Sequence, residues 1–250
     1  MKVTSFIPVL LLCIAWACSS DPQKDLPQPP AAQPERTILV FYKTAGFYHA
    51  SIPAGLAAIQ ELGKGNGFSV DTTNNAGKFT PAALDKYKAV VFLNTTGELL
   101  DASQQTSFQN YIRNGGGFVG IHAAADAEYG WPWYNLLLGA YFQDHPHIQE
   151  ATIQVNDHQH PATAFLPATW VRTDEWYNFR DLSPAISVLA TLDETTYTGG
   201  KHGVHHPIAW YQQFEGGRSF YTAGGHTIES YSEPLFLQHL LGGIKYAMGE

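Results

Sequence analysis

The chain has 250 residues, of which 44% are hydrophobic and 14% charged, and its formal net charge is −8. This length and hydrophobic content suffice for one good core and favour a single folded domain. No run of Lys and Arg is present, and an acidic chain without a clustered basic face excludes nucleic-acid binding. We therefore expect no nucleic-acid partner.

The N-terminal residues have the pattern of an export signal. An apolar stretch from Phe6 to Ala17 follows a positively charged start and is too short to be a structural membrane span. The next residue, Cys18, completes a sequence (AWAC) that is similar to a bacterial lipobox, with Ala15 in place of the usual Leu. We predict a lipoprotein signal peptide over residues 1–18; the alternative is a plain signal peptide cleaved nearby.

Lipidation of Cys18 would make this an exported bacterial lipoprotein, periplasmic or on the cell surface, with a membrane partner through its lipid anchor. Residues 19–36 are rich in Pro, Gln, Ala and Asp, which predicts an extended tether. The folded domain is then 37–250. Because Cys13 and Cys18 are the only cysteines, this domain has no disulfide, thiolate ligand or cysteine nucleophile.

Strand and helix patterns alternate from Thr37 onward. Short apolar runs predict strands at 37–42, 68–72, 89–93 and 118–121, and the segments between them predict helices at 52–62, 80–86 and 101–114. This alternation predicts parallel βαβ units, and so an α/β fold with three layers: a mostly parallel sheet with helices on both faces. Beyond residue 130 we expect short strands at 152–155, 186–191, 208–212 and 219–223 and a last helix at 233–248.

The segment Gly120–Ala124 (GIHAA) stands where a strand should turn sharply into a helix. In nucleophile-elbow enzymes the catalytic side chain occupies the middle of such a turn, at the carboxyl end of the sheet. The residue at that place here is His122. A polar residue that ends an apolar strand has little structural reason to be there, although a hydrogen-bonded structural histidine is the alternative.

Several motifs together resemble the ThuA-like, or trehalose-utilisation, family. They are TAGFYH at 44–49, GGGFVGIHAAAD at 115–126, HP at 145–146 and 160–161, DEWY at 174–177, PIAW at 207–210, and the stretch from GR at 217–218 to GH at 225–226. The resemblance covers residues 37–249 and implies a class I glutamine-amidotransferase-like fold of the flavodoxin-like kind. Amidotransferases of this fold use a Cys at the elbow with His and Glu partners. His122 replaces that Cys, so glutaminase chemistry does not carry over.

Four titratable residues in loops or short motifs are the candidate catalytic groups: His49, His122, Glu175 and His226. Imidazoles with one carboxylate suit two chemistries, general acid/base catalysis or a divalent metal site such as zinc. The metal-ligand candidates are the three histidines, although no compact zinc motif such as H-E-x-x-H is present. No Walker loop is present, and the triple glycine at 115–117 is too weak a signal to indicate a nucleotide cofactor.

Sugar sites often pair aromatic faces with hydrogen-bonding side chains. The candidate substrate-binding residues are Asp126, Tyr177, Trp176 and Tyr48, with core packing as the alternative for the rings. His145 and His160 each precede a proline and are expected to fix loop geometry. The histidines at 202, 205 and 206 could bind metal adventitiously.

The resemblance implies carbohydrate metabolism, with a glycoside or disaccharide derivative, such as a 3-keto sugar, as the small-molecule partner. A ketone acidifies the neighbouring C–H, so a His or Glu base could drive elimination, hydration or isomerisation without a redox cofactor. The expected activity is that of a sugar-processing lyase, hydratase, isomerase or hydrolase. The alternative is a non-catalytic lipoprotein that binds a glycan or scaffolds a sugar-processing assembly.

Overall fold

The computed structural model describes residues 1, 3 and 36–250, so nearly all of the predicted signal peptide, Cys18 and nearly all of the predicted tether lie outside the described residues. The strands are β1 (Thr37–Phe41), β2 (Ser69–Thr73), β3 (Ala89–Leu93), β4 (Gly117–Ile121), β5 (Tyr141–Asp144), β6 (Gln149–Val155), β7 (Thr169–Asp174), β8 (Asn178–Arg180), β9 (Ser187–Leu192), β10 (His206–Phe214) and β11 (Gly217–Thr222). The α-helices are α1 (Ile52–Asn66), α2 (Pro81–Leu84), α3 (Ala102–Arg113), α4 (Pro132–Leu138) and α5 (Pro234–Met248), and the turn after β4 is the 3-10 helix η2 (His122–Asp126).

Nine strands form one mixed sheet in the order β2-β1-β3-β4-β11-β10-β9-β6-β7. The first five strands in this order pair in parallel, whereas the last four are antiparallel. The α/β fold predicted from the sequence is confirmed, and its parallel part follows the predicted strands. The second half is antiparallel because its strands are joined by turns and loops without crossover helices, and only a crossover can return a strand in parallel.

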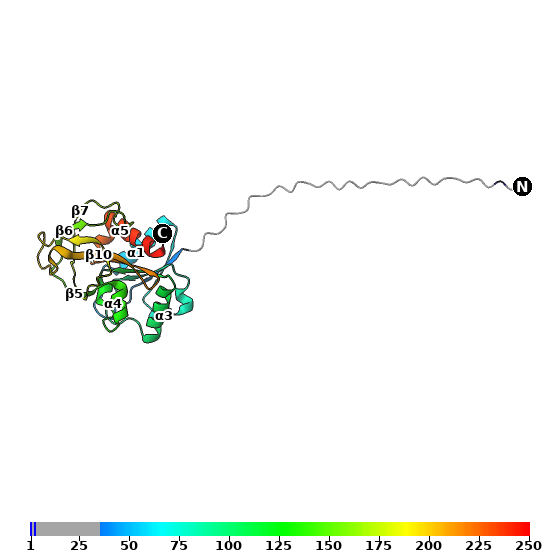
Figure 1. Ribbon diagram of the computed structural model, residues 1–250, viewed down its shortest axis with the longest axis horizontal. Helices are drawn as coiled ribbons and strands as arrows, with labels where there is room; N and C mark the ends of the chain where they lie inside the picture. The colour runs from blue at the N-terminus through cyan, green and yellow to red at the C-terminus, as the bar shows by residue number, and fades with distance from the viewer. Residues whose placement is uncertain (2, 4–35) are drawn as a thin grey trace. The chain divides into compact units, whose positions relative to one another are not determined.

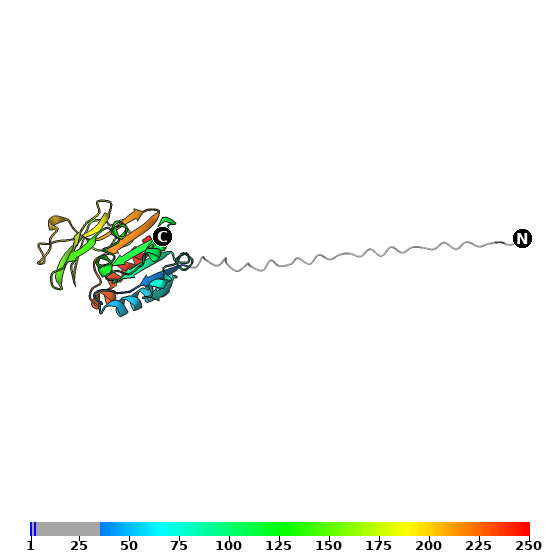
Figure 2. The same cartoon turned by 90° about the horizontal axis from the view of Figure 1, so that it is seen from below.

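Helices cover both faces of the sheet. The first and last helices, α1 and α5, lie together on one face, and α3 and α4 lie on the other (Figure 1). Viewed from below, the blue N-terminal strand lies toward one end of the sheet and the yellow-green strands toward the other, with the orange strands between them (Figure 2). None of the helices in residues 36–250 combines the length and the apolarity needed to cross a bilayer.

Aromatic side chains fill much of the space between the sheet and α3. Phe41, Phe79, Phe92, Phe108 and Phe118 are buried and contact one another with ring centroids 4.7 to 6.1 Å apart. Edge-to-face and offset contacts of this kind add to the free energy gained by burial. This rigid interior holds the carboxyl ends of β1, β3 and β4 in fixed relative positions, where the candidate site lies.

Side-chain caps begin two of the predicted helices. The side chain of Asp101 accepts hydrogen bonds from the backbone N–H groups of Ser103 and Gln104, and the Gln104 side chain accepts one from Asp101 N–H. Thr80 caps the short helix α2 before Pro81. The elements beyond residue 130 that had no sequence signal are α4, β5, β7 and β8.

Candidate metal-binding active site

His122 lies at the elbow predicted from the sequence, where β4 ends and η2 begins. Its φ angle is +47°, a left-handed value that is uncommon for a residue with a side chain and that clusters at functional sites. The Tyr221 hydroxyl donates to the His122 carbonyl at 2.8 Å, and His122 Nδ1 donates to the carbonyl of Ala223 at 2.7 Å. Because Nδ1 faces an acceptor and must carry a proton, the neutral ring has its lone pair on Nε2.

The four candidate catalytic residues come together around that lone pair. His49 is on the loop after β1, Glu175 follows β7, and His226 follows β11. One ligand atom from each of these three and one from His122 all lie within 4.8 Å of one another. Three of the four follow parallel strands that end at the same edge of the sheet, which is where ligands bind in open α/β folds.

The shortest distances in the cluster match those between ligands of one metal ion. His226 Nδ1 lies 3.1 Å and His122 Nε2 lies 3.4 Å from Glu175 Oε2, and the two ring nitrogens are 3.2 Å apart. With metal–ligand bonds of about 2.0–2.1 Å, two ligands of a tetrahedral ion are roughly 3.3 Å apart. These three atoms therefore have the spacing of one face of such a coordination shell.

His49 completes the set. Its ring centroid lies 5.0 Å from that of His122 and 5.1 Å from that of His226, and its Nδ1 is buried without a hydrogen-bond partner in the described residues. Burial, together with the nearby rings of His122 and His226, lowers the pKa of His49 to about 3. The neutral ring is the form that binds a metal, and one nitrogen of this ring lies within 4.8 Å of the other three ligand atoms.

The charges of the cluster also suit a cation. Burial alone would raise the pKa of Glu175, but the hydrogen bonds and charges of His122 and His226 outweigh it and hold this pKa well below its usual range. Burial would likewise lower the pKa of His226, and the Glu175 carboxylate instead raises it. An ionised carboxylate with three imidazoles is a donor set for zinc or a related divalent transition metal.

Asp174 joins the two segments that carry Glu175 and His226. Its fully buried carboxylate accepts the backbone N–H groups of Glu175 at 2.9 Å, Gly225 at 2.8 Å and His226 at 3.1 Å. The guanidinium of Arg172 lies 3.2 Å away and compensates its charge. A charge buried this deeply is stable only when it is paired and hydrogen-bonded in this way.

The carbonyl of Gly225 connects His226 to the loops after β1 and β3. It accepts hydrogen bonds from Ser51 Oγ at 3.2 Å, Asn94 Nδ2 at 3.1 Å and the Tyr231 hydroxyl at 3.1 Å. The φ angle of Gly225 is +111°, and a Cβ there would lie 2.7 Å from the Tyr231 hydroxyl oxygen. Glycine is therefore required at this position for the three loops to meet.

His145 contacts the side of Glu175 that faces away from the cluster. Its Nδ1 lies 3.1 Å from Glu175 Oε1 and 2.8 Å from the carbonyl of Pro146. The sequence analysis expected His145 only to fix loop geometry. Its contact with the second carboxylate oxygen is the arrangement by which neighbouring groups orient a ligating carboxylate.

The four predicted substrate-binding residues have different surroundings. Tyr48 is exposed beside His49, and Asp126 is half-buried and accepts a hydrogen bond from the Tyr129 hydroxyl at 2.7 Å. Burial raises the pKa of Asp126 despite that hydrogen bond. Tyr177 is buried with its ring 4.1 Å from that of His122, and Trp176 is fully buried with its indole N–H donated to the Gln149 carbonyl. The last two rings support the site from within the core.

The other histidines that the sequence analysis named lie away from the metal-ligand cluster. His160 is buried against the Tyr211 ring, and its Nδ1 accepts the N–H of Ala162. His206 is buried and pairs with Glu194 at 2.8 Å, 4.7 Å from the His202 ring. Within residues 36–250, only the cluster at the elbow gathers three or more potential metal ligands.

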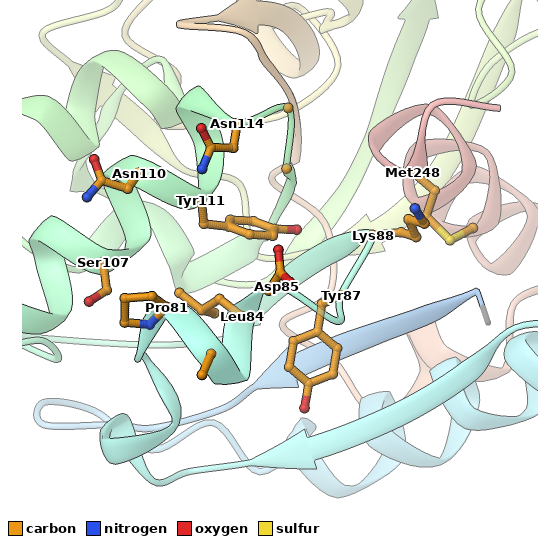
Figure 3. Close-up of a pocket in the computed structure, with 13 residues that line it drawn as sticks. Pro81, Leu84, Asp85, Tyr87, Lys88, Ser107, Asn110, Tyr111, Asn114 and Met248 are labelled. Atoms are coloured by element: carbon orange, nitrogen blue, oxygen red, sulfur yellow. The ribbon is translucent and has the colours of Figure 1, made fainter. Parts of the chain in front are cut away.

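A pocket of about 620 Å³ lies at the opposite, amino edge of the parallel strands (Figure 3). Ser107, Asn110 and Asn114 of α3 line one side of it, and Lys88, which precedes β3, and Met248 at the end of α5 line another. These side chains come from ordinary surface positions. The pocket is therefore not part of the metal-ligand cluster.

The fold and the site together define an α/β protein of the class I glutamine-amidotransferase-like type whose elbow carries a histidine. The sequence matches the ThuA family, described as trehalose utilisation, over residues 37–247. The chain belongs to this family, and the resemblance noted from its motifs is confirmed.

Solved structures agree with this assignment. A protein from Bacteroides uniformis described as ThuA-like is 26% identical, with a TM-score of 0.73 over 89% of this chain and 95% of that one. A second such protein, from Parabacteroides merdae, is 21% identical, with a TM-score of 0.69 over 86% and 90% of the two chains. A protein from Thermoplasma acidophilum described as a GMP synthase subunit is 14% identical and shares the fold, with a TM-score of 0.55 over 86% and 95%. No curated protein sequence matches this chain.

Proposed function

We propose that this protein is an enzyme of carbohydrate metabolism that uses one divalent metal ion held by His49, His122, Glu175 and His226. The observation that carries the proposal is the spacing of 3.1 to 3.4 Å among three of the ligand atoms, beside a buried His49 ring whose Nδ1 has no hydrogen-bond partner within residues 36–250. A purely structural histidine cluster would be expected to satisfy its buried nitrogens within the protein.

A glycoside or disaccharide derivative with an oxidised carbon, such as a 3-keto sugar, is the proposed substrate. The family's description supports a carbohydrate, and a keto group makes the adjacent C–H acidic enough for a protein base. A bound divalent metal would supply Lewis-acid polarisation of such a carbonyl oxygen. Elimination and isomerisation begin with this proton transfer, and hydration of an enone, the reverse of elimination, ends with the return of a proton to the same carbon.

The protein's own groups have separate tasks in this proposal. His122 and Glu175 hold their ligand atoms in place through Ala223 and His145, respectively. Asp126 lies outside the ligand set, and burial raises its pKa, which makes its carboxylate a stronger base for accepting a proton. Buried Tyr177 against the His122 ring keeps water from that side of the site.

Product analysis with matched native and 3-keto disaccharides tests the proposal, using residues 19–250 without a histidine tag. We expect wild type to convert the keto sugar, a chelator to abolish conversion, and His122→Ala to lose at least about 100-fold in kcat/KM. Full conversion by metal-free protein would contradict the proposed role of the metal. Full activity of His122→Ala would contradict the proposed location of the active site.

A glycan-binding lipoprotein without catalytic activity is the second candidate, and the exposed aromatic side chain of Tyr48 beside the cluster favours it. The same experiment separates the two functions. Saturable binding of the disaccharides without conversion, unchanged in His122→Ala, would support the binding protein.

We also propose export and anchoring through a lipid on Cys18, supported by the apolar run that precedes it and its lipobox-like sequence. Fractionation of cells that express the full chain tests this proposal. Wild type should sediment with membranes, and Cys18→Ser should not. A soluble wild-type protein would contradict the anchor.

A further inference from the structure

Two aromatic side chains beside the metal-ligand cluster face solvent. Phe47 is 64% and Tyr48 is 56% exposed, although the next residue, His49, is buried. Within residues 36–250, the only other Phe, Tyr or Trp classed as exposed is Phe165, at 37%. A phenylalanine left in water forgoes the free energy of burying its ring, which a bound ligand could recover in part.

Hydrogen bonds fix the loop that presents these rings. The backbone N–H of Ala45 donates to the Thr96 carbonyl at 2.7 Å, and that of Gly46 donates to Thr96 Oγ1 at 3.2 Å. Thr96 Oγ1 in turn donates to the carbonyl of Phe47 at 2.8 Å. Three bonds to one threonine hold the backbone of Phe47, so its exposure is a property of an ordered loop.

The Phe47 ring is adjacent to the ligand set. Its centroid lies 4.8 Å from that of His49 in an edge-to-face contact, and the His49 ring in turn contacts the rings of His122 and His226. Among the four proposed ligands, His226 has the most exposed side chain, whereas that of His122 is fully buried. The exposed ring of Phe47 is therefore in direct contact with one of the proposed metal ligands.

We propose that Phe47 is the aromatic wall of a substrate subsite that takes the apolar face of a pyranose ring. One face of such a ring presents C–H groups and its edge presents hydroxyls, so an aromatic surface beside polar, cationic chemistry matches both parts. Tyr48 extends the wall and adds a hydroxyl that can hydrogen-bond to a sugar. This inference rests on the proposed function and specifies its substrate as an intact pyranoside.

The test compares Phe47→Ala and Phe47→Tyr with Phe165→Ala, the matched loss of the third exposed aromatic. Calorimetry gives Kd for trehalose, and steady-state kinetics give KM and kcat for 3-keto-trehalose, with metal content measured in every variant. We expect Phe47→Ala to raise Kd and KM about tenfold, with kcat within about threefold and metal content unchanged. Phe47→Tyr should stay within about threefold of wild type, and Phe165→Ala should match it.

Each other outcome has a defined meaning. Unchanged Kd and KM in Phe47→Ala would contradict the proposal that Phe47 forms the wall of the subsite. Equal losses of affinity in Phe165→Ala would also contradict it. Loss of metal from Phe47→Ala would also overturn it, because the ring would then be supporting His49. If wild type binds trehalose but converts nothing, a rise in Kd for Phe47→Ala alone supports the wall while the enzymatic proposal fails.

Discussion

The two edges of the parallel strands differ in what they offer a ligand. The amino edge has a pocket of about 620 Å³, lined by ordinary polar groups such as those of Ser107 and Asn110. The carboxyl edge holds a residue with left-handed backbone, His122, and a buried unpartnered nitrogen on His49. Converging titratable groups, rather than open volume, distinguish the edge where chemistry is expected.

The largest expected difference between the two edges is in turnover. Glu175→Gln keeps the shape of the side chain and removes the charge that pairs with His226, so kcat/KM for the keto sugar should fall at least about 100-fold. Asn110→Ala in the amino-edge pocket should stay within about twofold. Similar losses from both changes, measured by steady-state kinetics, would remove the distinction between the edges.

Backbone conformation offers a second comparison. Gly225→Ala should destabilise the protein by about 2 to 3 kcal/mol and weaken metal binding, because the φ angle of +111° and the Tyr231 hydroxyl leave no room for a Cβ. Gly65→Ala is the control, since a Cβ at that helical position meets nothing within 4 Å. It should raise stability by up to about 1 kcal/mol in urea unfolding. Equal effects of the two changes would contradict the strained loop.

Buried histidines away from the site sharpen the comparison through pH. Burial lowers the pKa of both His160 and His239 to about 4, so the unfolded chain binds more protons between pH 4 and 6.5. Their contribution to stability is complete above pH 6.5 and is lost as the pH falls. For each histidine, the free energy of unfolding should fall by about 2 kcal/mol as the pH is lowered from 7.5 to 5. Urea unfolding at both pH values should show that His239→Gln loses less stability than wild type when the pH is lowered. The same pH dependence in both proteins would contradict this account.

The smallest expected effect concerns the orientation of a ligand. His145→Ala should weaken metal binding about tenfold, because Glu175 Oε1 loses the partner that lies 3.1 Å away. His145→Asn, whose amide can donate from a similar position, should stay within about threefold. Competition with a chromophoric chelator measures both affinities. Equal values for wild type and His145→Ala would show that His145 has no positioning role.

Local sequence signals predicted the parallel half of the fold well. The apolar run at 89–93 is β3, and the helix predicted from residue 101 is α3, which begins with a capping box at Asp101. The elbow at His122 could also be predicted, because glycines and alanines flank a polar residue at the end of an apolar strand. Each of these signals lies within a few residues of the element that it specifies.

Long-range contacts could not be predicted in the same way. Glu175 follows β7 at the far end of the sheet, and it reaches His122 because Asp174 binds the backbone of Gly225 and His226. The place of His145 against Glu175 depends on the same folded loops, so its proline neighbour suggested only a structural role. The spacing of residues along the chain does not predict these contacts, because they depend on how the antiparallel strands pair and on buried hydrogen bonds.

The number of metal ions bound by each chain tests the central claim most directly. Residues 19–250, prepared without a histidine tag, are equilibrated with zinc, separated from free ion and analysed for metal and protein. We predict about one ion per chain in wild type and a large loss in His122→Ala and His226→Ala, with unchanged circular dichroism. A wild-type chain that holds no divalent ion and converts substrate equally well in a chelator would contradict the account.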